Sequence, residues 1–266
     1  MDVREFKELI EDRGRELFRR MPWREDTQPY YVLVSELMLQ QTQVARVIPK
    51  FQAFVTRFPD IRSLANADLS DVLVLWQGLG YNRRAKFLHD AAKRIAIKFD
   101  GVFPETSEDI LSLPGVGKNT LGAIEAYAMN RPAIFVETNV RTVYIHHFFD
   151  DDVDVEDSQI REMLTRTLDV EHPREFYWAI MDYGSWLKAN GVRNIGQSKH
   201  YKKQAVLEGS VRQMRGRIIR ALTRGATTET DLSMIVDADE RFAAALSGLM
   251  NDGLVARSGS MIHLTK

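Results

Sequence analysis

Residues 113–120 read Leu-Pro-Gly-Val-Gly-Lys-Asn-Thr and combine features that favour binding of an anion. Gly115 and Gly117 permit a tight turn and let a ligand come close to the backbone. A helix is predicted to begin directly after them, so its free N–H groups and the positive end of its dipole face the turn. A DNA phosphate fits such a site, and Lys118 adds positive charge. A Gly-x-Gly turn by itself is also common as a plain connection between two helices.

The complete string resembles the hairpin of helix-hairpin-helix (HhH-GPD) DNA-repair glycosylases, and four further segments support the resemblance. They are similar to blocks of the adenine-DNA glycosylase (MutY-like) branch and occur in that family's order and spacing. The resemblance covers about residues 5 to 190 and implies a two-lobed all-α fold that acts on double-stranded DNA with a mismatch or lesion. The segments are Pro22-Trp23-Arg24, Ser35-Glu36-Leu37-Met38-Leu39-Gln40-Gln41-Thr42-Gln43-Val44, Gly78-Leu79-Gly80-Tyr81 and Thr138-Asn139-Val140-Arg141.

The resemblance assigns catalytic work to Glu36, which matches the acid that protonates the departing base. A Glu in an apolar helix more often lies on an exposed face; as the family's acid, Glu36 is expected to be buried with a raised pKa suited to proton delivery. Gln40, Gln41 and Tyr81 match residues that fill the duplex where the target base leaves it. Such a wedge offsets part of the unstacking cost of base flipping.

Other positions match the base pocket and the phosphate contacts. Trp23 and Arg24 match residues that line the pocket, whereas Trp178 stands where relatives carry a polar residue, which leaves the identity of the accepted base open. A core position is the alternative for Trp178. The residues expected at DNA phosphates are Gly115, Gly117, Lys118, Thr120, Arg193, Lys199, Lys202 and Lys203.

Two substitutions depart from the family pattern at the reaction centre. Glu137 replaces an Asp that stabilises positive charge growing on the sugar, and it is expected to take over that role. A helix N-terminal charge is the alternative for Glu137. Asn119 stands where bifunctional relatives such as the endonuclease III family carry a Lys nucleophile. An amide forms no Schiff base, so the sequence predicts a monofunctional enzyme, and Lys118 points about 100° away around the helix.

The 266 residues include no cysteine, which excludes thiolate-held iron–sulfur clusters, disulfides and cysteine nucleophiles. Relatives hold a four-cysteine cluster just after the segment that matches 179–187. The loop 191–201 is therefore expected to be held by packing, with its basic residues replacing the electropositive loop of the cluster. No cofactor and no metal are expected. His146 and His147 beside the acidic run Asp150–Asp157 are interpreted as part of a solvated loop rather than a metal site.

Composition is that of a globular protein, with 44% hydrophobic and 27% charged residues and a net charge of −1. The charge is unevenly distributed, because Arg193–Arg224 carries nine basic residues and one acid, whereas Asp150–Asp157 carries six acids and no base. A basic stretch is compatible with a polyanionic partner or with a solvated face. No apolar run approaches a membrane span. A monomer in the cytoplasm, or in the nucleus of a eukaryote, is expected.

Helical periodicity dominates up to residue 205, which predicts about ten helices and a glycosylase domain over 1–205. Its central lobe is expected at about 23–130, and its second lobe at 1–22 plus 131–205. Residues 206–266 are expected to form a winged-helix-like α+β domain, from three helices and a hairpin around Ser258-Gly259-Ser260. Arginines of its first helix, Arg212, Arg215, Arg217, Arg220 and Arg224, are candidates for phosphate contact, with packing or protein docking as the alternative.

These observations favour a base-excision DNA glycosylase, with adenine opposite 8-oxoguanine or guanine as the expected substrate. A mismatch thymine or uracil glycosylase on the same scaffold is one alternative, and there Glu36 would position water because a pyrimidine has no N7. A non-catalytic DNA-binding or regulatory protein is the other.

Overall fold

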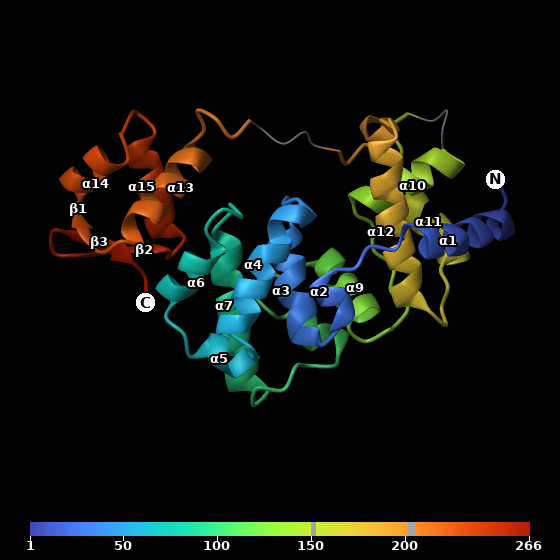
Figure 1. The fold of residues 1–266 in the computed structure, drawn as a ribbon, viewed down its shortest axis with the longest axis horizontal. Helices are drawn as coiled ribbons and strands as arrows, with labels where there is room; N and C mark the ends of the chain where they lie inside the picture. Colours follow the sequence, from blue (N-terminus) through green and yellow to red (C-terminus); the bar gives the residue numbers. More distant parts are fainter. Residues whose placement is uncertain (150–152, 202–205) are drawn as a thin grey trace. The chain divides into compact units, whose positions relative to one another are not determined.

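The computed structural model describes residues 1–149, 153–201 and 206–266, and these fall into two compact units. The first unit comprises residues 1–32 and 116–203, and the second comprises 33–115 and 204–266. The sequence predicted lobe boundaries at 22/23 and 130/131 and a separate domain over 206–266. These boundaries remain predictions, because the two compact units do not test them. Figure 1 shows the order of the elements.

The first unit is built from helices, with α3 continuing into the second unit. The helix that contains Gly14 packs closely against the helix that contains Ala179. A Cβ built on Gly14 would lie only 2.9 Å from the Cβ of Ala179. Phe6 and Ile10 of the helix that contains Gly14 are buried, which accounts for its amphipathic pattern. The elements are α1 (Val3–Leu17), α2 (Pro22–Glu25), α3 (Pro29–Leu39), α9 (Lys118–Tyr127), α10 (Thr138–Phe148), α11 (Asp157–Thr167), α12 (Pro173–Ala189) and the 3₁₀ turn η1 (Asn194–Gln197).

The second unit contains five further helices ahead of the C-terminal region, with a core that includes Phe51, Phe54, Leu73 and Trp76. Its helices are α4 (Val44–Arg57), α5 (Ile61–Ala65), α6 (Leu69–Trp76), α7 (Arg83–Lys98) and α8 (Ser107–Leu111). Two short helices were not expected from the sequence. Pro22 starts α2 instead of opening a loop, because proline is tolerated in the first turn of a helix. Asp60 caps α5, accepting a hydrogen bond from the Ser63 amide at 2.7 Å.

The C-terminal residues form the expected small α+β arrangement. Its elements are α13 (Val211–Leu222), β1 (Thr227–Thr228), α14 (Glu229–Ile235), α15 (Phe242–Asn251), β2 (Val255–Ser258) and β3 (Met261–Leu264). The strands pair antiparallel in the order β1-β3-β2, with Val255 opposite Leu264 and Ser258 opposite Met261. Thr228 caps α14 as predicted, because its hydroxyl accepts from the Asp231 amide. The all-α assignment with a small α+β end is confirmed. No helix among the described residues is long and apolar enough to span a membrane.

Candidate active site

The turn between α8 and α9 shows why its two glycines are needed for different reasons. Gly115 has a φ of +81°, and a Cβ there would lie 2.8 Å from the Cβ of Phe87, so both conformation and space require glycine. Gly117 is exposed at the start of α9 with no atom within 4 Å of a Cβ built on it, which leaves the backbone approachable. Lys118 is exposed in the first turn of α9. Such an N-terminus is chemically able to hold a phosphate.

Asn119 has a definite structural partner beside that turn. Its side-chain amide donates to the carbonyl oxygen of Val136 at 2.8 Å. Val136 directly precedes Glu137, so Asn119 fixes the backbone next to the candidate carboxylate. An amide at this position orients and hydrogen-bonds, and it supplies no nucleophilic amine.

Glu137 occupies the N-cap position of α10 and is half-buried. Burial raises the pKa of its carboxyl above the ordinary value, and the positive charge of Lys188 is the largest effect that opposes this rise. The side-chain amide of Asn139 donates to Glu137 Oε1 at 3.4 Å. In turn, burial lowers the pKa of the Lys188 amine, while the Glu137 charge raises it. Glu137 is therefore a carboxylate in a poorly solvated place within the electrostatic reach of two cations, Lys188 and Arg141, and such a group suits interaction with a developing positive charge.

Glu36 lies in the second unit, on α3, between the buried side chains of Ser35 and Leu37. The residue is half-buried rather than fully buried. The helix around it is apolar, and Val34 and Met38 are among its fully enclosed neighbours. A carboxyl group at the edge of such an apolar helix is suited to general acid catalysis.

Gln40, Gln41 and Tyr81 line one hollow of about 430 Å³ in the second unit. Gln41 and Tyr81 both have left-handed backbones, with φ of +55° and +46°. Non-glycine residues adopt this region at a cost, and such strain is concentrated at functional sites. The structure thus brings together the three residues predicted to fill the duplex.

Arg84, which the sequence analysis did not single out, holds this hollow in shape. Its buried guanidinium donates to the carbonyl oxygens of Leu37 (2.7 Å), Met38 (2.9 Å), Gln40 (2.5 Å) and Gly80 (3.0 Å). It therefore joins the end of α3 to the turn that carries Tyr81. Burial lowers its pKa to about 10, so the group stays charged at neutral pH.

Arg212 of α13 lies over the ring of Tyr81, with its guanidinium carbon 4.9 Å from the ring centroid, and donates to the Tyr81 hydroxyl. Arg215 pairs with Asp252 at 2.5 Å. Arg212 and Arg215, two of the five arginines expected at phosphates, therefore have side-chain partners within the protein. Arg224 was expected on this helix but lies two residues beyond its end.

Arg24 is committed to a buried ion pair in the first unit. Its guanidinium donates to both carboxylate oxygens of Asp182, at 2.7 and 3.1 Å, and Arg19 donates to the same carboxylate at 2.7 Å. The buried Asp182 carboxylate is thereby neutralised by two arginines. Trp23 beside it is buried.

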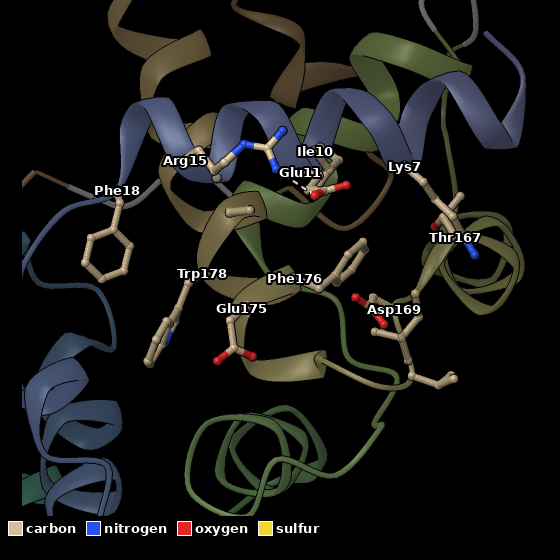
Figure 2. A pocket seen from close by; sticks show the side chains of 14 residues that line it. Lys7, Ile10, Glu11, Arg15, Phe18, Thr167, Asp169, Glu175, Phe176 and Trp178 are labelled. Atoms are coloured by element: carbon tan, nitrogen blue, oxygen red, sulfur yellow. Dashed lines mark hydrogen bonds and ion pairs between the residues drawn. The ribbon is translucent and has the colours of Figure 1, made fainter.

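Trp178 contacts the side chains of Arg24 and Phe18. The guanidinium carbon of Arg24 lies 5.4 Å from the Trp178 ring centroid, and the Phe18 ring lies 6.0 Å away. Trp178 also borders a cavity of about 630 Å³ between α1, the end of α11 and the start of α12 (Figure 2). Apolar side chains such as Phe176 and an ion pair between Arg15 and Glu11 line the same cavity.

The loop that follows α12 is tied down by hydrogen bonds as well as by packing. Val155 N–H donates to Gln197 O at 2.8 Å, Lys199 N–H donates to Val155 O at 3.1 Å, and Asn194 donates to the Thr142 carbonyl at 2.9 Å. The Lys199 amine pairs with Glu156 at 2.5 Å. Arg193 donates to the Lys188 carbonyl. Lys202 and Lys203 lie outside the described residues.

No group of three or more histidines and carboxylates in the described ranges is arranged to hold a metal ion. His147 bonds through Nε2 to the Tyr183 hydroxyl at 2.9 Å. Asp150–Asp152, part of the predicted acidic loop, lie outside the described residues.

Comparison with known proteins identifies the family. Residues 34–168 match the HhH-GPD superfamily of base excision DNA repair proteins. The chain belongs to this superfamily. It is 32% identical to the adenine DNA glycosylase of Mycobacterium tuberculosis, over 90% of this chain and 86% of that protein. It is 36% identical to the adenine DNA glycosylase of Buchnera aphidicola over 66% of this chain, and spans only about half (51%) of that protein's length. The predicted membership of the superfamily's MutY-like branch is confirmed.

Solved HhH-GPD structures share the fold. A thermostable thymine-DNA glycosylase superposes with a TM-score of 0.62 at 23% identity, over 69% of this chain and 86% of that chain. An endonuclease III–DNA covalent intermediate gives a TM-score of 0.56 at 17% identity, over 70% of this chain and 87% of the other. The turn at Gly115, the hollow lined by Gln40, Gln41 and Tyr81 (the wedge hollow) and the half-buried Glu36 therefore lie in the fold of a superfamily of base excision DNA repair proteins.

Proposed function

We propose that this protein is a monofunctional adenine DNA glycosylase that removes adenine mispaired with 8-oxoguanine or guanine. The observation that carries the proposal is the 32% identity to an adenine DNA glycosylase over 90% of the chain. The retained Glu36 and the three residues around the wedge hollow support it. The product is free adenine and an abasic site in an intact strand.

In the proposed reaction Glu36 donates a proton to N7 of the flipped adenine, which makes the base a neutral leaving group. The bond between N9 and the sugar C1′ breaks, and the electron pair leaves with the base. The carboxylate of Glu137 stabilises the positive charge that develops on the sugar. Water then adds to C1′ and gives a proton to the Glu36 carboxylate, which restores the acid.

The test is single-turnover excision on duplexes that carry A, T, U or hypoxanthine opposite 8-oxoguanine, guanine or the normal partner, with abasic sites scored after alkali. We expect release of adenine opposite 8-oxoguanine or guanine. Release only of T or U would contradict the adenine proposal and favour the mismatch-pyrimidine alternative. Absence of release from every duplex would favour a non-catalytic DNA-binding protein.

Glu36→Gln tests the proton donor directly. Loss of general acid catalysis typically lowers a rate by about 10²–10⁴-fold, whereas duplex binding is expected to change by no more than several-fold. Glu125→Gln is a matched control, since Glu125 is also a half-buried helical glutamate, on α9. Excision by Glu36→Gln at the rate of the control would refute the assignment.

A further inference from the structure

The arginines of α13 fall into two groups that face different surroundings. Arg212 and Arg215 are held by Tyr81 and Asp252. Arg217, Arg220 and Arg224 are exposed, and together they line a separate hollow of about 380 Å³ next to the end of α14. Arg217 and Arg220 lie three residues apart on one face of α13, and Arg224 follows in the turn two residues beyond the last helical residue, Leu222.

These three side chains make few interactions with the rest of the protein. Arg217 makes a long hydrogen bond, 3.4 Å, to the Val236 carbonyl, and within the described ranges Arg220 and Arg224 form no ion pair and no side-chain hydrogen bond. Neighbouring like charges on one helix face destabilise the helix. The cluster is therefore not explained by the stability of the fold.

The acids nearby do not neutralise the hollow. Asp239 is paired with Arg241, whose hydrogen bonds are the main cause that lowers the pKa of Asp239 to about 2, and the charge of Arg217 adds to the same shift. Asp237 is the one carboxylate that lines the hollow. Three guanidinium groups thus face one acid, and the hollow keeps a net positive charge at neutral pH.

The helix that would read bases in a winged-helix protein does not share this character. The exposed positions of α15 include Ala243, Ala244 and Ser247, which are small and uncharged. Asp239 and Asp252 flank its two ends, and each is paired with an arginine, Arg241 and Arg215 respectively. A polyanion is therefore attracted to α13 and not to α15.

We propose that Arg217, Arg220 and Arg224 form a phosphate-binding site through which the C-terminal region holds the backbone of duplex DNA, independently of sequence and lesion. The inference rests on the proposed function for its choice of DNA as the polyanion. Duplex DNA carries about one phosphate charge per 1.7 Å of its axis, so neighbouring phosphates are spaced closely enough to meet a cluster of guanidinium groups. Guanidinium groups bind phosphate oxygens by charge-assisted hydrogen bonds.

The test compares two double variants by binding to an undamaged 30-base-pair duplex between about 50 and 300 mM salt. Arg220→Gln with Arg224→Gln removes the proposed contacts. Arg161→Gln with Arg166→Gln is the matched control, because both arginines are exposed on a single helix, α11. Each lost phosphate contact lowers the slope of log affinity against log salt by about 0.9.

We expect the α13 variant to lose about 1.8 from that slope, and to bind at least 10-fold more weakly at 0.1 M salt, whereas the control keeps the wild-type slope. An α13 variant with the affinity and slope of the control would overturn the site, and would direct attention to an acidic protein partner. Because undamaged DNA is the probe, a wild type that binds but releases no adenine would contradict only the proposed function.

Discussion

At the scale of single residues, Glu137 and Glu156 form an informative pair, because each stands at the N-cap of a helix but in opposite surroundings. Burial raises the pKa of Glu137. The Lys199 amine lowers the pKa of Glu156, whose side chain is about half exposed. The charge of Glu137 is therefore a cost to the fold, and that of Glu156 is not. A residue that costs stability and is nonetheless ionisable is a candidate for function.

We predict that Glu137→Gln slows single-turnover excision about 10²-fold or more while raising the melting temperature at pH 7. A carboxyl whose folded pKa is raised adds stability below its unfolded pKa and loses it as pH rises through the folded value, so the neutral amide is favoured at pH 7. The gain over wild type is expected to fade as the pH approaches 4.

Glu156→Gln is the control for that prediction, and its effect has the opposite sign. Its lowered pKa adds stability above the ordinary value, so the variant is expected to melt slightly lower at pH 7 and to excise normally. Glu137→Asp is expected to keep measurable activity because it retains the charge. Wild-type excision by Glu137→Gln would show that the residue is only a helix-terminal charge.

The residue types of the candidate site could be read from local motifs, but their partners could not. Arg24 contacts Asp182, which is 158 positions away, and Tyr81 contacts Arg212, which is 131 positions away. Nothing in a local pattern encodes such pairs. The role of Arg84 was missed for the same reason, because its acceptors are backbone carbonyls at the end of another helix and in the turn before it.

At the scale of the elements, close helix crossings depend on glycines that the sequence alone did not explain. A Cβ on Gly184 of α12 would lie 2.8 Å from both the Cβ and the carbonyl oxygen of Asn139 on α10. Gly216 of α13 is also inside a helix, but no atom lies within 4 Å of a Cβ built there. The same substitution should therefore have opposite effects at the two positions.

We predict that Gly184→Ala lowers the free energy of unfolding by about 1–3 kcal/mol, because the added methyl group forces the two helices apart. Gly216→Ala is expected to raise it by about 0.5–1 kcal/mol through its better helix propensity. Urea or thermal unfolding of both variants is the measurement. Equal stability changes would show that α10 and α12 can separate at no cost.

Periodicity located the longer helices well, and it failed where elements are short. The apolar pattern predicts helices at 69–76, 83–98, 107–111 and 211–222, and these are the bounds of α6, α7, α8 and α13. The helices α2 and α5, with four and five residues, were missed: α2 is marked by its proline and α5 by its cap, whereas α8, which also has five residues, was predicted. The sequence predicted a two-stranded hairpin, whereas the sheet has a third strand, β1. That strand was missed because it has only two residues, Thr227 and Thr228.

At the scale of the whole molecule, the fate of the DNA strand depends on whether any amine can attack the sugar. Asn119 provides none, and its amide is occupied by the Val136 carbonyl. Lys188 is the described lysine whose pKa is lowered, and it lies close enough to Glu137 for their charges to interact. It is therefore the amine that most needs to be tested.

We predict that the wild-type protein leaves an intact abasic strand, cleaved only after alkali or heat, and forms no covalent adduct with DNA under borohydride. Lys188 is expected not to react because its charge balances Glu137, and a protonated amine is no nucleophile. Lys188→Gln is thus expected to change excision through Glu137, without changing the product. Borohydride adducts at the level of an endonuclease III control would contradict the prediction. Their loss in Lys188→Gln would then identify this lysine as a nucleophile that replaces the one missing at position 119.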